Sequence, residues 1–221
     1  MHRVGIVGAG SISRVHAAAW ARLPVELAGW HDVVPEAAVA AAERWGGIDV
    51  YLANAGIEGQ LSPIPDYPID VFDRVMAVNV RGVWLGIKYV VPVMRERGGG
   101  SIVITSSTAG IGAGPDMSAY TTSKHAVIGM TETAAIELAP AGIRVNAVCP
   151  GPVDTRMLES IAAGKFPDDP DLFLKRSDER NPMGRRGKPE EVVALVTFLA
   201  SEDASYINGG WHTVDGGWAA G

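Results

Sequence analysis

Three side chains in the middle of the chain have the types and spacing needed for proton transfer at an oxygen atom. Tyr120 and Lys124 are four residues apart, so on a helix they stand one turn apart on one face. An ammonium group beside a phenol favours the phenolate, and a phenol of pKa about 10 needs a shift of about 3 units to act near neutral pH. Ser107, thirteen residues before the tyrosine, can hydrogen-bond to a substrate oxygen. Together they suit general acid–base catalysis at a carbinol or carbonyl oxygen. The alternative is an ordinary pair on a helix surface.

The elements that must position these side chains alternate along the chain. Short apolar runs that end in turn residues predict strands at Val4–Val7, Val25–Trp30, Ile48–Ala53, Ser101–Ser106, Ile143–Val148 and Trp211–Val214. The segments between them predict helices at Ser11–Leu23, Pro35–Trp45, Ile69–Arg97, Ser118–Leu138 and Pro189–Ala200. Residues 152–188 carry Pro, Gly and many charges, which predicts a mobile flap over a site. Within it, the mixed charges of Asp168–Arg180 predict a surface helix.

This alternation predicts an α/β fold, a doubly wound parallel sheet of the Rossmann-like kind with helices on both faces. In such sheets ligands bind at the carboxyl ends of the strands. Asn54, Ser107 and Pro150 all follow or end predicted strands, so we expect them at one shared edge.

Composition excludes several classes of function. The 221 residues suit one domain, and a net charge of −6 without a basic block argues against nucleic acid as a partner. Cys149 is the single cysteine, so no intrachain disulfide can form. The chain has no signal-peptide pattern and no membrane-length apolar run, so we expect a cytoplasmic protein without a membrane partner. The five histidines lack metal-ligand spacing, so no metal is expected.

From about Ile48 to Gly221 the chain resembles the short-chain dehydrogenase/reductase family. The motifs that carry the resemblance are Asn54-Ala55-Gly56, Asn79-Val-Arg-Gly82, Ser106-Ser107-Thr-Ala-Gly110, Tyr120-x3-Lys124, Ile143-Arg-Val-Asn146, Pro150-Gly-Pro-Val-Asp-Thr155 and Val214-Asp-Gly-Gly217. Their number and order make the resemblance specific.

The resemblance implies catalytic roles for four residues. Tyr120 would be the general acid/base, and Lys124 would hold a cofactor ribose and lower the tyrosine pKa. Ser107 would position the substrate oxygen, and Asn79 would support a proton relay through water. A hydrogen bond at a helix bend is the alternative for Asn79.

Further residues are implied in cofactor binding. Pro150, Gly151, Val153 and Thr155 would border the nicotinamide, although Thr155 could instead be only a helix cap. Asn54, Ala55 and Gly56 would lie beside the cofactor. A role for Asn54 in tying neighbouring strands is itself expected in this family.

Residues 1–47 resemble a different nicotinamide enzyme, the glucose–fructose oxidoreductase and inositol dehydrogenase type. The turn Gly8-Ala9-Gly10 leads into Ser11 and Ile12, where backbone amides can approach a pyrophosphate at a helix start. Asp32 could bind a ribose diol and repel a 2′-phosphate, which favours NAD over NADP. A plain tight turn and a loop carboxylate are the alternatives.

The chain therefore reads as one domain with a join near Ala41–Gly47, combining a grafted nucleotide-binding segment (1–47) and a dehydrogenase segment (48–221) with its flap (152–188). The expected strand order is 2-1-3-4-5-6, which is flavodoxin-like at the first five strands, with the family's usual edge strand missing. Right-handed crossovers would then place helix Pro35–Trp45 on the face opposite helix Ser11–Leu23.

The predicted function is an NAD-dependent oxidoreductase that interconverts a small-molecule secondary alcohol and a ketone. The alternatives are a rearranged or engineered scaffold that folds without catalysis, and a dinucleotide-binding module without turnover. By resemblance, the helices at Ile69–Arg97 and Ser118–Leu138 predict a homodimer or homotetramer.

Overall fold

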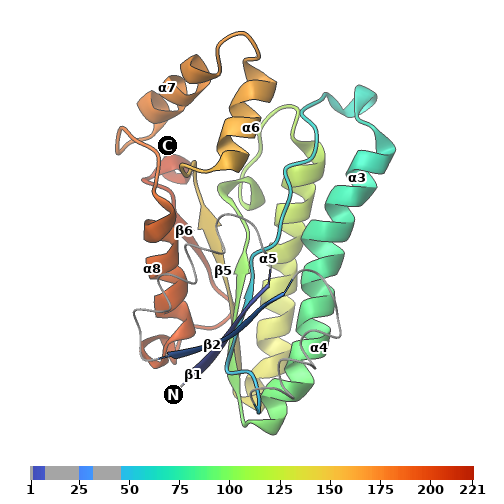
Figure 1. The fold of residues 1–221 in the computed structure, drawn as a ribbon, viewed down its shortest axis with the longest axis vertical. Helices are drawn as coiled ribbons and strands as arrows, with labels where there is room; N and C mark the ends of the chain where they lie inside the picture. The colour runs from blue at the N-terminus through green and yellow to red at the C-terminus, as the bar shows by residue number, and fades with distance from the viewer. Residues whose placement is uncertain (1, 8–24, 32–45) are drawn as a thin grey trace.

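Figure 1 shows the fold in a computed structural model, which describes residues 2–7, 25–31 and 46–221. The predicted helices Ser11–Leu23 and Pro35–Trp45 lie outside the described residues, as does all of the proposed join except Gly46 and Gly47. The same holds for the predicted cofactor residues Gly8, Gly10, Ser11, Ile12 and Asp32.

One parallel sheet organises the described part of the chain. Its strands are β1 (His2–Val7), β2 (Val25–His31), β3 (Val50–Ala53), β4 (Gly100–Thr105), β5 (Ile143–Pro150) and β6 (Trp211–Val214). Every neighbouring pair is parallel, and the order across the sheet is β2-β1-β3-β4-β5-β6. The predicted α/β class, with a parallel Rossmann-like sheet, is confirmed.

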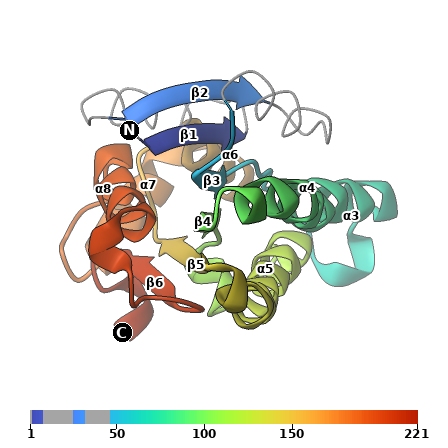
Figure 2. The same ribbon diagram turned by 90° about the horizontal axis from the view of Figure 1, so that it is seen from below.

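Alternating side chains of the central strands form two cores, one on each face. Val50 and Leu52 of β3 pack with residues of α8 (Pro189–Ala200), whereas Tyr51 and Ala53 face the other way. The second face is covered by α4 (Gly82–Glu96) and α5 (Ser118–Leu138). Figure 2 shows α8 on one side of the strands and α4 with α5 on the other. This is the period-two pattern of strands buried on both faces.

Two predicted segments differ from the structure. The single helix expected at Ile69–Arg97 is α3 (Ile69–Met76), a π-helical turn (Ala77–Arg81) and α4. The flap expected at residues 152–188 contains two helices, α6 (Arg156–Lys165) and α7 (Pro170–Arg180). Thr155 caps α6, and Asp169 caps α7 by accepting a hydrogen bond from the Leu172 amide at 3.0 Å. These caps satisfy amides that a helix start leaves without intrahelical partners.

The parallel arrangement brings three chain segments together at the carboxyl edge of the sheet. β3 ends at Ala53, β4 at Thr105 and β5 at Pro150. The β3 and β4 ends are tied, because Thr105 Oγ1 donates a hydrogen bond to Asn54 Oδ1 at 3.0 Å. This confirms the strand-tying interpretation of Asn54 and sets the floor of a pocket.

Candidate active site

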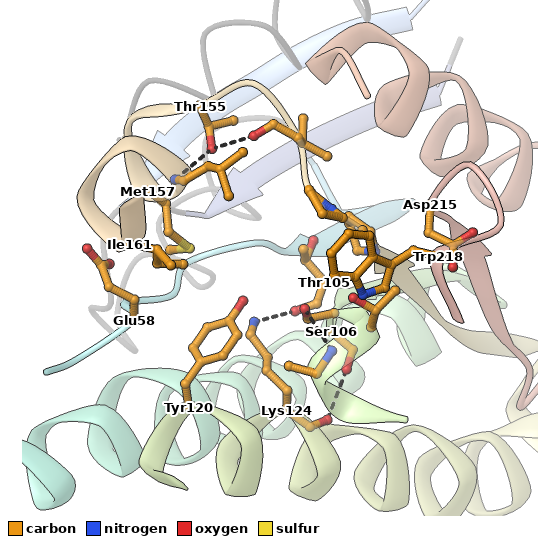
Figure 3. A pocket seen from close by; sticks show the side chains of 18 of the residues that line it. Glu58, Thr105, Ser106, Tyr120, Lys124, Thr155, Met157, Ile161, Asp215 and Trp218 are labelled. Atoms are coloured by element: carbon orange, nitrogen blue, oxygen red, sulfur yellow. Dashed lines mark hydrogen bonds between the residues drawn. The ribbon is translucent and has the colours of Figure 1, made fainter. Parts of the chain in front are cut away.

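Tyr120 and Lys124 lie one turn apart on α5 and both are buried, with 8% and 4% of their surface exposed. Figure 3 shows the phenol oxygen and the ammonium group pointing into the same pocket. Lys124 Nζ donates a hydrogen bond to the Thr105 carbonyl oxygen at 2.8 Å and lies 5.6 Å from the centroid of the Tyr120 ring. The end of β4 therefore holds the lysine beside the tyrosine.

The two neighbouring serines have different roles: Ser106 anchors α5, whereas Ser107 presents its hydroxyl group to the pocket. Ser106 Oγ is buried and donates to the Lys124 carbonyl oxygen at 2.9 Å, which fixes α5 against the end of β4. Ser107 caps a short 3-10 turn, where its Oγ accepts a hydrogen bond from the Ala109 amide at 3.1 Å. Ser107 also hydrogen-bonds the Tyr120 side chain. Because the Ala109 bond uses only an acceptor site, the Ser107 hydroxyl proton remains available to the phenol or to a substrate oxygen.

Burial dominates the electrostatics of the pair. It raises the pKa of Tyr120 above its usual value, a nearby Glu58 carboxylate raises it further, and the Ser107 hydrogen bond lowers it. Burial also lowers the pKa of Lys124 to about 8, against a smaller opposing effect of Cys149. In the protein alone the pKa of Tyr120 is therefore raised, because burial disfavours the charged phenolate. The lowering of this pKa by Lys124 stays a prediction.

Asn79 lies in the π-helical turn and is almost fully buried. Its Oδ1 accepts a hydrogen bond from the Ile57 amide and its Nδ2 donates to the Ile57 carbonyl oxygen, each at 2.9 Å. Nδ2 also donates to Ser123 Oγ at 3.0 Å. Both amide protons are thus used, so the side chain positions the segment after β3. The relay through water stays a prediction.

The segment after β5 is held by packing and by a cap. Gly151 lies against Asp215, where an added Cβ would come 2.7 Å from the Asp215 Cβ. Val153 is buried in the core beside α8. Thr155 Oγ1 accepts a hydrogen bond from the Leu158 amide at 3.5 Å and donates to the Val153 carbonyl oxygen at 3.2 Å. The cap interpretation of Thr155 is therefore confirmed, while its place beside a nicotinamide is untested.

These segments surround a pocket of about 1320 Å³. The predicted residues that line it are Asn54, Ala55, Gly56, Ser107, Tyr120, Lys124, Pro150, Gly151, Val153 and Thr155. Asn79 does not line the pocket, but it hydrogen-bonds to the backbone of Ile57, which does. The structure thus brings together the predicted site residues of the dehydrogenase segment.

Among the lining residues that the sequence did not predict, three bear on the chemistry of the pocket. Glu58 follows the Asn54-Ala-Gly motif by two positions, so its place after a strand end was a usable signal. Trp218 and Arg180 also line the pocket, and the guanidinium carbon lies 4.5 Å from the Trp218 ring centroid. This contact joins α7 to the C-terminal turn across 38 residues of sequence, and no local sequence pattern predicts it.

The described part of the chain holds neither a cluster of metal ligands nor a membrane-spanning helix. No group of three or more His, Cys, Asp or Glu side chains there is placed to hold a metal ion. None of the helices described is long and apolar enough to cross a membrane.

Comparison with known proteins places this site in a family. The family described as Enoyl-(Acyl carrier protein) reductase matches residues 13–219. Levodione reductase of Leifsonia aquatica is 40% identical over 194 residues, covering 86% of this chain and 73% of the relative. A 2-(R)-hydroxypropyl-CoM dehydrogenase of Xanthobacter autotrophicus is 42% identical over 202 residues, covering 90% and 78%.

Solved structures agree with these relatives. A crystal structure of levodione reductase superposes with a TM-score of 0.95 at 34% identity, covering 99% of this chain and 98% of the other. NAD⁺-bound xylitol dehydrogenase superposes with a TM-score of 0.84 at 30% identity, covering 96% and 97%.

Fold and site together define an oxidoreductase of the α/β class. The chain belongs to the short-chain dehydrogenase/reductase family, which interconverts secondary alcohols and ketones with a nicotinamide dinucleotide. The family match begins at residue 13 and so includes most of the segment 1–47. The comparisons give no support to the resemblance of that segment to the glucose–fructose oxidoreductase type.

Proposed function

We propose that this chain oxidises a secondary alcohol, or reduces the matching ketone, with Tyr120 as proton donor and acceptor and with NAD as cofactor. The observation that carries the proposal is the buried Tyr120–Lys124 pair, which faces a large pocket together with Ser107. NAD rather than NADP rests on Asp32, whose carboxylate would repel a 2′-phosphate.

The residues of the pocket fit such a dinucleotide. An ammonium group has three donors, and Lys124 Nζ has one acceptor among the described residues, the Thr105 carbonyl oxygen. Its remaining donors suit ribose hydroxyl oxygens, while Gly151, Val153 and Thr155 would border the nicotinamide. When bound, the nicotinamide supplies the hydride acceptor for oxidation or the hydride donor for reduction.

The chain's own residues handle the proton. In oxidation the Tyr120 phenolate takes the proton of the substrate hydroxyl, and in reduction the Tyr120 phenol returns one to the carbonyl oxygen. Ser107 donates a hydrogen bond to the same oxygen and holds it beside the phenol. Asn79 holds Ile57, and thereby the wall opposite α5.

Exposed apolar side chains on the covering helices support an assembled form. Trp84 of α4 is 50% exposed and Ile136 of α5 is 79% exposed. Because large exposed apolar groups favour contacts between chains, we propose a homodimer or homotetramer that uses these helices. Sedimentation of the wild type and of the Ile136→Glu variant tests this, since the variant should dissociate.

Titration with NADH and with NADPH, followed by a screen of secondary alcohols, tests the reaction. Tight binding of NADH with weaker binding of NADPH is expected. Tyr120→Phe should lower kcat by roughly 10²- to 10⁴-fold while leaving NADH binding in place. A folded wild type that binds neither dinucleotide, or a Tyr120→Phe variant with undiminished turnover, would overturn the proposal.

A further inference from the structure

One carboxylate in the pocket has no partner within the described part of the chain. Two carboxylates line the pocket there, Glu58 and Asp215. Both oxygens of Asp215 are used, because they accept hydrogen bonds from the amides of Gly217 and Ala219 at 3.1 and 2.9 Å. Glu58 makes no hydrogen bond or ion pair with any described residue, so its acceptor sites are open to a ligand.

The segment that carries Glu58 is held from both sides. Its predecessor Ile57 is clamped by two hydrogen bonds from Asn79. Its successor Gly59 has a φ of +74° and lies close to the side chains of Tyr67 and Val75. A charged side chain on a segment fixed in this way is presented to the pocket at a defined place.

The surroundings of Glu58 combine the reacting group with an apolar wall. Glu58 lines the pocket together with Met157 and Ile161 of α6, and Figure 3 shows these three side chains on one side of the pocket, above the Tyr120 ring in this view. Its carboxylate also acts electrostatically on the phenol of Tyr120. A substrate that fills this space removes water from a half-buried carboxylate, which is unfavourable unless the substrate donates a hydrogen bond in return.

From this geometry we infer that Glu58 is a specificity-determining residue that accepts a hydrogen bond from a second hydroxyl group of the substrate. The inference rests on the proposed function and narrows its substrate class to diols, hydroxyketones and related polyhydroxylated compounds. A neutral donor is favoured over an ammonium group, because Lys124, Arg156 and Arg180 already supply positive charge to the pocket.

The test compares alcohols that differ only in the second group. Cyclohexanol, the trans-1,2- and trans-1,4-cyclohexanediols and trans-4-aminocyclohexanol are oxidised by the wild type and by the Glu58→Leu and Glu58→Gln variants. Glu96→Gln is the matched control, because Glu96 is exposed at the end of α4 that precedes β4, away from the pocket.

We expect the wild type to favour the better diol over cyclohexanol in kcat/KM by about 10- to 100-fold, as one hydrogen bond to a charged group would supply. Glu58→Leu should abolish this preference and Glu58→Gln should weaken it, while Glu96→Gln keeps it. An unchanged diol-to-cyclohexanol ratio in Glu58→Leu overturns the inference, as does a wild-type preference for the amino alcohol.

A binding measurement distinguishes a failure of the Glu58 inference from a failure of the proposed function. Calorimetric titration of the NADH-loaded protein with the better diol measures affinity without turnover, because NADH cannot accept a hydride from an alcohol. Oxidation of cyclohexanol with a ratio insensitive to Glu58 leaves the function standing and removes the inference. If diol binding weakens about tenfold or more in Glu58→Leu but no alcohol is oxidised, the inference about Glu58 stands and the proposed function is removed.

Discussion

The Asn79 side chain makes two hydrogen bonds to the backbone of Ile57: Oδ1 accepts from the Ile57 amide and Nδ2 donates to the Ile57 carbonyl oxygen, each at 2.9 Å. These two hydrogen bonds join the π-helical turn to the segment that follows β3, 22 residues earlier in the chain. Since that segment carries Glu58 and borders the pocket, a buried amide remote from the reacting oxygen controls the shape of the site.

Replacing Asn79 by Leu should therefore cost both stability and order at the pocket. The Ile57 amide and carbonyl would lose their partners, and each unsatisfied buried group costs about 1–3 kcal/mol. We expect the free energy of unfolding in urea to fall by at least that amount. Ser123→Ala removes the third hydrogen bond of Asn79 and the bond from Ser123 Oγ to the Tyr120 carbonyl oxygen, but it leaves both Ile57 bonds in place, so its free energy of unfolding should fall by less. Equal losses in the two variants would contradict the clamp.

The pH dependence of alcohol oxidation should respond in opposite directions to two neighbours of Tyr120. Oxidation needs the phenolate, so a raised pKa places the rise of kcat/KM at alkaline pH. Ser107→Ala removes the bond that lowers the pKa of Tyr120 and should move the rise to higher pH. Glu58→Gln removes a charge that raises this pKa and should move it to lower pH.

The two profiles are measured at saturating dinucleotide, together with the wild type. Lys124, whose pKa burial lowers to about 8, also titrates at alkaline pH. It is unchanged in both variants, so the displacement between the profiles belongs to Tyr120. Displacements of the same sign would contradict the assignment of Tyr120 as the titrating base.

Much of the site could be predicted because its residues follow strand ends. Asn54, Ser107 and Pro150 come after short apolar runs, and a parallel sheet necessarily brings such positions to one edge. The Tyr120–Lys124 pair needed only the period of a helix. These relationships are local in sequence, or follow from the topology alone.

The rest depended on contacts that sequence patterns do not encode. The clamp of Asn79 on Ile57 needs a π-helical turn, and the stacking of Arg180 on Trp218 needs the C-terminal turn to reach α7. Within residues 152–188, the helix predicted at Asp168–Arg180 is confirmed as α7. α6 was also predictable, since Thr155 is a good N-cap.

Gly151 should tolerate no side chain. An added Cβ would lie 2.7 Å from the Asp215 Cβ and 2.9 Å from its Cα, and backbone atoms cannot move aside cheaply. We expect Gly151→Ala to lower the free energy of unfolding by about 1–3 kcal/mol, as overpacking does. Gly129→Ala, in an exposed part of α5 with nothing within 4 Å, should instead stabilise by up to about 1 kcal/mol. Thermal or urea unfolding of both variants checks the contrast, which fails if Gly151→Ala is as stable as the wild type.

Lys165 should control how α6 closes over the pocket. Its Nζ donates to the Pro115 carbonyl oxygen at 2.8 Å and to Asp116 Oδ2 at 2.7 Å. Asp116 has a φ of 66°, the one positive value among the described residues other than glycine, and its carbonyl oxygen accepts from the Ser62 amide at 3.0 Å. Lys165 therefore joins α6 directly to residues 115–116 and, through Asp116, to the segment at Ser62.

Lys165→Met should loosen this junction and raise the KM for the alcohol several-fold, while NADH affinity changes little. Loss of one partly buried, charge-assisted contact of about 1–2 kcal/mol supports a change of that size. Lys175→Met is the control, because the Lys175 pair with Glu179 spans 3.9 Å on the exposed side of α7 and should contribute almost nothing. Since α6 carries Met157 and Ile161, the KM effect should be larger for bulky alcohols than for small ones. A KM that rises equally in the Lys175 variant would show a general effect of lost charge rather than a specific junction.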